Sequence, residues 1–145
     1  MKIIDFIVCD DIRQEIGNKL TIVGIYNDRI KIEAKDPGAI KFPIPFRLGV
    51  FTRILVESTD ECSDELSFNL DVKHNSELLF QADGNAKVVG RGDDGSVIVA
   101  VPLLANIVPI KGAGHLEFCL TIKAAGKELL KYSPEYDFEI EVVQK

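Results

Sequence analysis

Three glycines in the stretch VVGRGDDGSV, residues 88–97, have the spacing of a dinucleotide-binding loop. Gly90, Gly92 and Gly95 match the pattern G-x-G-x-x-G. Such a loop holds a pyrophosphate only where it leads from a strand into a helix whose first amides point at the phosphates. Here the run SVIVAV follows, and its β-branched residues favour a strand. We therefore predict a hairpin turn with an exposed tip at residues 91–94, and we give the Arg-Gly-Asp tripeptide within it no adhesive role.

A second group of residues that could do chemistry is an acidic loop at residues 57–65. Its carboxylates could supply oxygen ligands to Ca²⁺, which prefers six to eight of them. The loop lacks the D-x-D-x-D-G spacing that would make a calcium site specific, so a solvated acidic surface is the favoured interpretation. A Ca²⁺-dependent binding domain is the alternative. The acidic residues concerned are Asp60, Glu61, Asp64 and Glu65.

Nucleophiles and metal ligands are sparse. The two histidines, His74 and His115, have no partner at zinc-binding spacing, and the three cysteines form no C-x-x-C pair. Cys62 lies among acidic residues, which disfavour a thiolate, and Cys119 lies on the polar face of a predicted strand. We predict no cofactor and no metal, and a hydrolase whose site no motif reveals is the third hypothesis.

Charge and cysteine usage exclude several classes of partner. The 145 residues include 17 basic and 23 acidic ones, giving a net charge of −6, and basic residues never cluster. Binding to nucleic acid or to an anionic membrane is therefore not expected. An odd number of cysteines without a disulfide pattern predicts free thiols and a cytoplasmic location. The longest apolar run, residues 96–110, contains two prolines and is too short to span a bilayer as a helix.

The elements that must position these residues are strands, because apolar residues alternate with polar ones along most of the chain. In ELSFNLDVK, residues 65–73, every second side chain from Leu66 to Val72 is apolar. The same alternation predicts strands at 29–34, 77–82, 115–123 and 136–143, and more fully covered strands at 2–9, 19–26 and 46–56. About nine or ten strands follow.

The connections carry the glycine, asparagine and aspartate of tight turns. We predict turns at 26–29, 73–77, 82–85, 90–96 and 124–128, and sequential antiparallel pairing around them. Residues 35–45 hold three prolines and are expected to cross from one sheet to another. A single helical turn is expected within residues 11–18, ended by Gly17.

Two packed sheets are the simplest way to cover so many one-sided strands without helices. The predicted fold is an all-β, antiparallel two-sheet β-sandwich of immunoglobulin-like or Greek-key type, with a closed β-barrel as the runner-up. It spans residues 1–145 as one domain.

Two groups of residues are candidates for an interaction patch. The run 96–110 is apolar on both faces, with Val97, Val99, Val101 and Leu103 on one and Ile98, Ala100 and Leu104 on the other. Both faces then need cover, either from the loop 35–45 or from a second subunit. The other candidate is a polar cluster at the end of the first strand, formed by Asp10, Asp11, Arg13 and Glu15.

The N-terminal part of the chain resembles a family of short bacterial and phage-encoded proteins of unknown function. The resemblance rests on the segment IDFIVCDDIRQEIGNKLTIVGIYNDRI followed by FPIPFRLGVFTRI, over about the first 55 residues. It implies a single β-sandwich and assigns no activity or catalytic residue. Fold and composition together predict a non-enzymatic protein-interaction or assembly module whose partner is a protein, with a homodimer as the favoured form.

Overall fold

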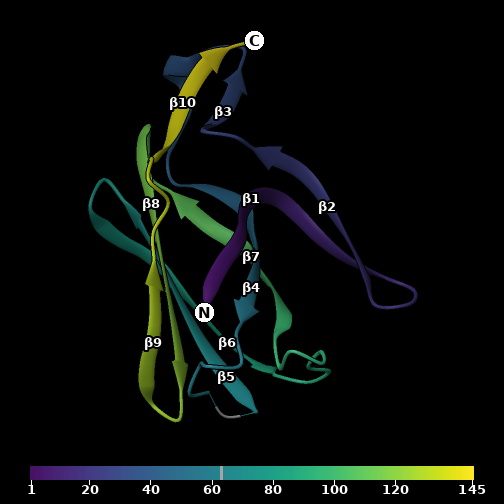
Figure 1. Cartoon of the computed structure of the whole chain (residues 1–145). Helices are drawn as coiled ribbons and strands as arrows, with labels where there is room; N and C mark the ends of the chain where they lie inside the picture. The colour runs from purple at the N-terminus through teal and green to yellow at the C-terminus, as the bar shows by residue number, and fades with distance from the viewer. Residues whose placement is uncertain (63) are drawn as a thin grey trace.

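The computed structural model describes residues 1–62 and 64–145, which form ten strands in two sheets (Figure 1). This confirms an all-β fold with two sheets, and one 3₁₀ turn, η1 (Pro37–Ala39), is the sole helical element of the described residues. The strands are β1 (Lys2–Glu15), β2 (Lys19–Tyr26), β3 (Arg29–Ala34), β4 (Ile44–Val56), β5 (Glu65–His74), β6 (Glu77–Lys87), β7 (Val97–Ile110), β8 (Gly114–Ala124), β9 (Lys127–Tyr132) and β10 (Phe138–Gln144).

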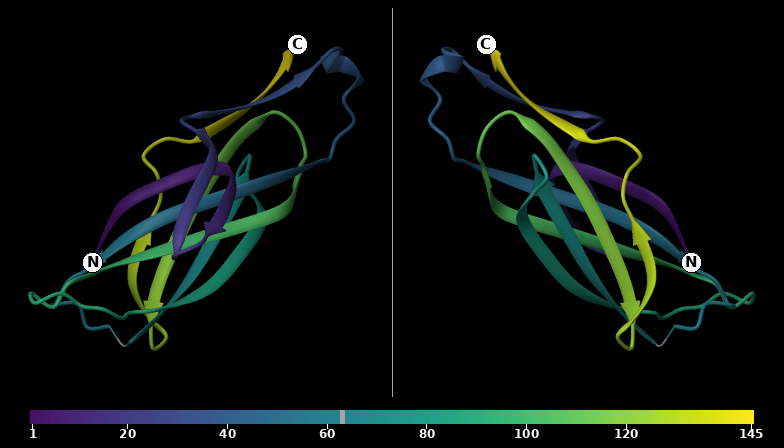
Figure 2. Two further views of the ribbon diagram at one scale, coloured as in Figure 1. Left: turned by 90° about the vertical axis from the view of Figure 1, so that its right-hand side faces the viewer. Right: turned by 90° about the vertical axis from the view of Figure 1, so that its left-hand side faces the viewer.

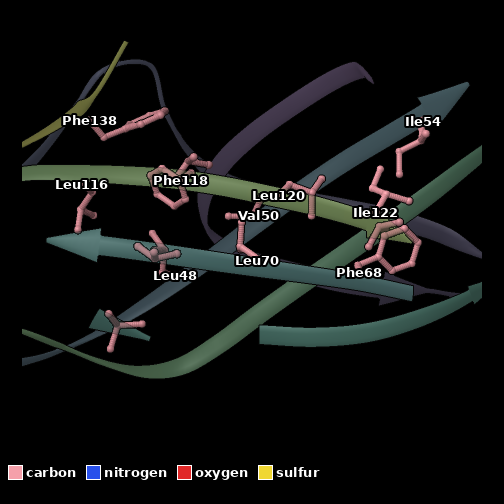
Figure 3. Packing of buried hydrophobic residues seen from close by; sticks show 14 of the residues in the cluster. Leu48, Val50, Ile54, Phe68, Leu70, Leu116, Phe118, Leu120, Ile122 and Phe138 are labelled. Carbon is pink, nitrogen blue, oxygen red and sulfur yellow. The ribbon is translucent and has the colours of Figure 1, made fainter. Parts of the chain in front are cut away.

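The alternating sequence pattern builds the core directly. Along β5, the side chains of Leu66, Phe68, Leu70 and Val72 are buried, and those between them reach the outer surface. In Figure 3 the labelled side chains of β4 face those of β5 and β8 across the space between the sheets. Burial of these apolar faces is the main favourable contribution to folding.

The two sheets differ in pairing. The smaller sheet has the order β2-β1-β4-β7 and is antiparallel throughout. The larger sheet has the order β3-β10-β8-β5-β6, with β9 also paired to β8. The prediction of an antiparallel fold is wrong at one place, since β3 and β10 pair in parallel. No hairpin joins these two strands, so the intervening chain is free to return β10 in the same direction as β3.

Two local predictions are also wrong. The helical turn expected within residues 11–18 is absent, because β1 continues to Glu15 and pairs there with Lys19 across a tight turn. Gly17 and Asn18, both with positive φ, make that turn. The turn expected at 82–85 lies inside β6, where Gly84 pairs with Phe68 and continues the ladder. Glycine and asparagine there do not break the strand, because Asp83, Gly84 and Asn85 all stay in register with β5.

The segments that connect the strands agree with the sequence predictions only in part. Residues 35–43 run from β3 in the larger sheet to β4 in the smaller one, which confirms the predicted crossing. The glycine-rich segment 88–96 joins β6 to β7 without a helix, and β7 begins at Val97 just after Gly95. The predicted hairpin there is wrong, because β6 and β7 lie in different sheets, and the same holds for β2 and β3 on either side of the turn at 26–29. Figure 2 shows β3 and β10 side by side, reaching away from the rest of the sandwich toward the C-terminus.

Candidate functional site

Strand β7 lies at the edge of the smaller sheet and sorts its apolar residues between two faces. Val99 and Val101 are buried in the core, and Val97 and Leu103 pack against it. These four residues of the predicted patch therefore serve the interior. The residues between them, Ile98, Ala100, Pro102 and Leu104, are exposed on the outer face, and Ile98 keeps 54% of its surface accessible. The loop 35–45 therefore does not cover that face.

The outer face of the smaller sheet carries an apolar band across all four strands. The register places Ile7, Phe51 and Pro102 in one row, and Ile25, Cys9, Gly49 and Leu104 in the next. Paired residues in a sheet share a face, so these rows are neighbours on one surface. We call these seven residues the apolar band. A side chain at Gly49 would meet the Cys9 Sγ at 2.9 Å, so the glycine leaves room for Cys9 to be fully buried beneath the surface.

Ion pairs flank the band on both sides. On one side Arg53 pairs with Asp5. On the other, the Asp11 carboxylate lies 2.7 Å from Arg47 Nη2 and 2.9 Å from Arg13 Nε. The hydrogen bond from Arg13, together with the charges of Arg47 and Arg13, lowers the pKa of Asp11 below its ordinary value, against a smaller opposing effect of desolvation. Both ends of the band are thus held by guanidinium–carboxylate contacts.

The predicted polar cluster is only partly assembled. Asp11 and Arg13 do meet, and Arg47 of β4 joins them. Nothing in the local pattern marks Arg47, because β4 reaches this position only through long-range pairing with β1. Glu15 instead lies at the end of the hairpin, opposite Lys19.

Asp10 turns away from Asp11 and contacts β2. Its carboxylate accepts a hydrogen bond from the Tyr26 hydroxyl and lies against Gly24. Burial raises the pKa of Tyr26, and the Asp10 charge raises it further. Gly24 has φ +65°, and a Cβ there would lie 2.0 Å from the Asp10 carboxylate oxygen. Asp10 thus has a structural partner and is separate from the outer-face ion pairs.

The acidic loop uses its charges within the chain. The Met1 ammonium group lies 2.7 Å from the Asp60 carboxylate, which also accepts a hydrogen bond from the backbone N–H of Glu57. Glu61 pairs with Lys127 at 3.5 Å. Over residues 1–62 and 64–145, no cluster of three or more histidine, cysteine, aspartate or glutamate side chains could hold a metal ion. Among the described residues, Asp64 and Glu65 enter no such cluster.

Histidines and cysteines are dispersed. His74 is buried at the end of β5, beside a cavity of about 330 Å³, and its Nε2 has no hydrogen-bond partner among the described residues. His115 lies at another hollow, with Asp28, Asp137 and Glu139. All three cysteines are described and none is in a disulfide. Arg91 Nη2 lies 3.2 Å from Cys62 Sγ, in the loop that the sequence identified as a turn.

Comparison with protein-family models and with curated proteins finds no match in either case. The resemblance to a phage and bacterial family therefore stays a prediction. Within the described ranges, no helix is both long and apolar enough to cross a bilayer. Of the predicted patch residues, Asp11 and the Arg13 bound to it belong to the outer face of the smaller sheet, where Ile98 and Leu104 of β7 are exposed.

Proposed function

We propose that this chain is a non-enzymatic interaction or assembly module that self-associates through the outer face of its smaller sheet. The observation that carries the proposal is the apolar band flanked by the ion pairs of Asp5 and Asp11. Three residues of the band, Ile25, Pro102 and Leu104, are exposed, and Ile7 and Phe51 are half-buried. Soluble domains rarely expose a large apolar patch without a partner for it. Charged residues at the rim and apolar ones at the centre are the arrangement typical of protein–protein interfaces.

The size of the face is suitable for a weak or standard interface. Neighbouring strands lie about 4.8 Å apart, and successive side chains on one face of a strand lie about 6.8 Å apart. At these spacings, the part of the outer face that extends from the pair Leu55 and Ile98 to the pair Val23 and Asp11 has a projected area of roughly 550 Å². A corrugated surface has a larger accessible area than its projection. Standard interfaces bury about 800 Å² per partner, so this face is of the required order.

A second copy is the favoured occupant because the face is self-complementary in charge. Each side of the band presents both an acid and a guanidinium, as Asp5 with Arg53 and Asp11 with Arg47. A twofold-related copy can therefore place carboxylates opposite guanidinium groups in either orientation across the band. The five flanking charges, Asp5, Asp11, Arg13, Arg47 and Arg53, are close to balanced, although the whole chain carries −6.

Two further expectations belong to the same proposal. The immunoglobulin-like or Greek-key classification is supported by the two-sheet architecture and by the passage of the chain from one sheet to the other between β3 and β4 and between β4 and β5. A cytoplasmic location is supported by the free state of Cys9, Cys62 and Cys119.

Sedimentation velocity between 5 μM and 1 mM tests the self-association. We expect the wild-type chain to dimerise, and Ile25→Glu and Leu104→Glu each to raise the dimer Kd at least ten-fold, since each puts a charge on the band. Val89→Glu is the matched control, because Val89 is 68% exposed but lies in the 88–96 segment, away from the band. A strict monomer at 1 mM, or equal weakening by all three substitutions, would contradict the proposal.

A further inference from the structure

The outer face of the larger sheet has the opposite chemistry from the apolar band. A groove of about 610 Å³ crosses β6, β5, β8 and β9 there. The side chains that line it are polar, most of them short, and come from alternate positions of their strands: Ser67, Asn69, Asp83, Asn85, Thr121 and Lys123. The volume is in the range of pockets that hold small molecules.

Strand register arranges these groups in two parallel rows. Asn85, Ser67, Lys123 and Glu128 are successive partners in one row, and Asp83, Asn69 and Thr121 in the next. Neighbours within a row are separated by about 4.8 Å and the rows by about 6.8 Å. Hydroxyl, amide and carboxylate groups are thus presented as a regular array on a rigid sheet.

One contact fixes part of the array in advance. Asn69 Nδ2 donates to Asp83 Oδ1 at 2.6 Å, which orients the Asn69 amide so that its oxygen and the second Asp83 oxygen are available to a ligand. In the next row along the strands, Gln81 Nε2 donates to Asp71 Oδ1 at 2.7 Å. Side chains that are already oriented lose less entropy when a ligand binds.

We propose that this groove binds a neutral polyhydroxylated ligand, namely a short oligosaccharide. Hydroxyl groups donate and accept at once, and the groove offers both acceptors, at Asp83, and donors, at Thr121 and Lys123. The aromatic residue at the groove, Phe68, is buried on the inner side, so there is no platform on which a nucleobase could stack. The charges of Asp83 and Glu128 against Lys123 disfavour a polyanion.

The absence of an aromatic platform among the groove residues also sets the strength of binding. Affinity must come from hydrogen bonds in competition with water, each of which contributes little net free energy. We therefore expect dissociation constants in the millimolar range. The groove is formed by the larger sheet alone. It goes beyond the proposed self-association, which uses the other sheet.

Titration of the ¹⁵N-labelled chain with maltotriose, cellotriose and triacetylchitotriose, followed by NMR, tests the site. We expect at least one sugar to shift the backbone amides of residues 67–69, 83–85 and 121–123, and the side-chain amides of Asn69 and Asn85. Asn69→Ala and Asn85→Ala should each raise the Kd about five-fold through the loss of one or two hydrogen bonds. Lys73→Ala, farther along the outer face of β5, is the matched control and should leave the Kd unchanged.

The same spectra separate the competing outcomes. No perturbation by any of the three sugars at 50 mM would overturn the proposal, as would sugar-dependent shifts that both asparagine variants leave intact. Groove shifts produced by CaCl₂ or inorganic phosphate and by no sugar would identify an ion site instead. Because Leu104→Glu changes the other sheet, it should raise the dimer Kd without altering sugar-dependent shifts, so the two proposals can fail independently.

Discussion

At the scale of single residues, the contact between Asp10 and Gly24 joins β1 to β2. Gly24 combines a left-handed φ of +65° with the close approach of the Asp10 carboxylate, which also accepts the Tyr26 hydroxyl hydrogen bond. Only glycine meets both conditions, because any Cβ would occupy the place of the carboxylate. This contact places the N-terminal hairpin beside the apolar band.

Gly24→Ala is therefore expected to destabilise the fold by about 2 to 4 kcal/mol. About 1 to 2 kcal/mol comes from the left-handed backbone and the remainder from displacement of Asp10 and loss of its hydrogen bond to the partly buried Tyr26. Urea unfolding measures the change. Gly112→Ala, where a Cβ meets nothing within 4 Å, is the control. In the Gly24→Ala background, Asp10→Ala should cost less than it does alone, and strict additivity would contradict this account.

The thiol of Cys9 gives a prediction about pH. Burial raises the pKa of Cys9 from 9.0 to about 11, with smaller contributions from Asp10 and Asp11 in the same direction and a backbone hydrogen bond opposing them. The folded chain therefore holds this proton more tightly than the unfolded chain does. Its contribution to stability is fully present below pH 9 and is lost as the pH rises toward 11.

We expect the free energy of unfolding to fall between pH 9 and pH 11 more steeply in the wild-type chain than in Cys9→Ala. Urea unfolding at pH 8, 9, 10 and 10.5 measures both slopes, and the difference between them removes the effect of groups common to the two proteins. Alkylation of the native chain at pH 8 should likewise modify Cys62 and Cys119 before the fully buried Cys9. Parallel slopes would show that Cys9 titrates in the same way in both states.

At the scale of elements, β7 is an unusual edge strand because it is 14 residues long and has no charged side chain. Edge strands of that kind are prone to pair with other chains. The strand contains two prolines, Pro102 and Pro109, which an edge strand tolerates because no further strand needs a hydrogen bond from their backbone nitrogens. Both lack an N–H, so they oppose the addition of a further strand while leaving the face free to dock.

Pro102→Thr should consequently form assemblies larger than a dimer. The substitution restores a backbone donor in the middle of the free edge and adds a residue with high strand propensity. Light scattering during incubation at 100 μM detects the growth, and Pro134→Thr, in the loop between β9 and β10, is the control. If both variants stay in the wild-type oligomeric state, the prolines do not guard the edge.

The sequence predicts those strands that have a local alternating pattern, and it does not predict pairing between segments that are far apart in the chain. Strands such as β5 and β8 follow from alternation within nine or ten residues, because burial of one face imposes a period of two. Strand β9 was missed since Leu129 and Leu130 are adjacent and give no alternation. The parallel pairing of β3 with β10 joins residues more than 100 positions apart and has no local signature.

At the candidate site too, local alternation predicts part of the arrangement and strand pairing decides the rest. Alternation identified the two faces of the run 96–110 but could not say which one is inside, because both are apolar. The sequence prediction named Val97, Val99, Val101 and Leu103, and the fold buries or half-buries these four instead of their neighbours. The sidedness is fixed by β4, whose buried Val50 and Ile54 pair with Leu103 and Val99.

At the scale of the whole molecule, net charge opposes the proposed association although the contact face itself is nearly balanced. Each copy carries −6, mostly from acidic residues outside the band. Repulsion between two such molecules acts over the Debye length, which falls from about 30 Å at 10 mM salt to about 8 Å at 150 mM. Screening should therefore help two copies to approach.

We expect the dimer Kd to decrease about three-fold or more between 20 and 300 mM NaCl, as sedimentation velocity at fixed pH 7.5 will measure. An interface held mainly by charges of opposite sign on the two partners would weaken over the same range, so the sign of the salt effect separates apolar from electrostatic association. Arg53→Gln removes one flanking charge and should leave that sign unchanged. A Kd that rises with salt would show that the ion pairs, and not the apolar band, hold the two copies together.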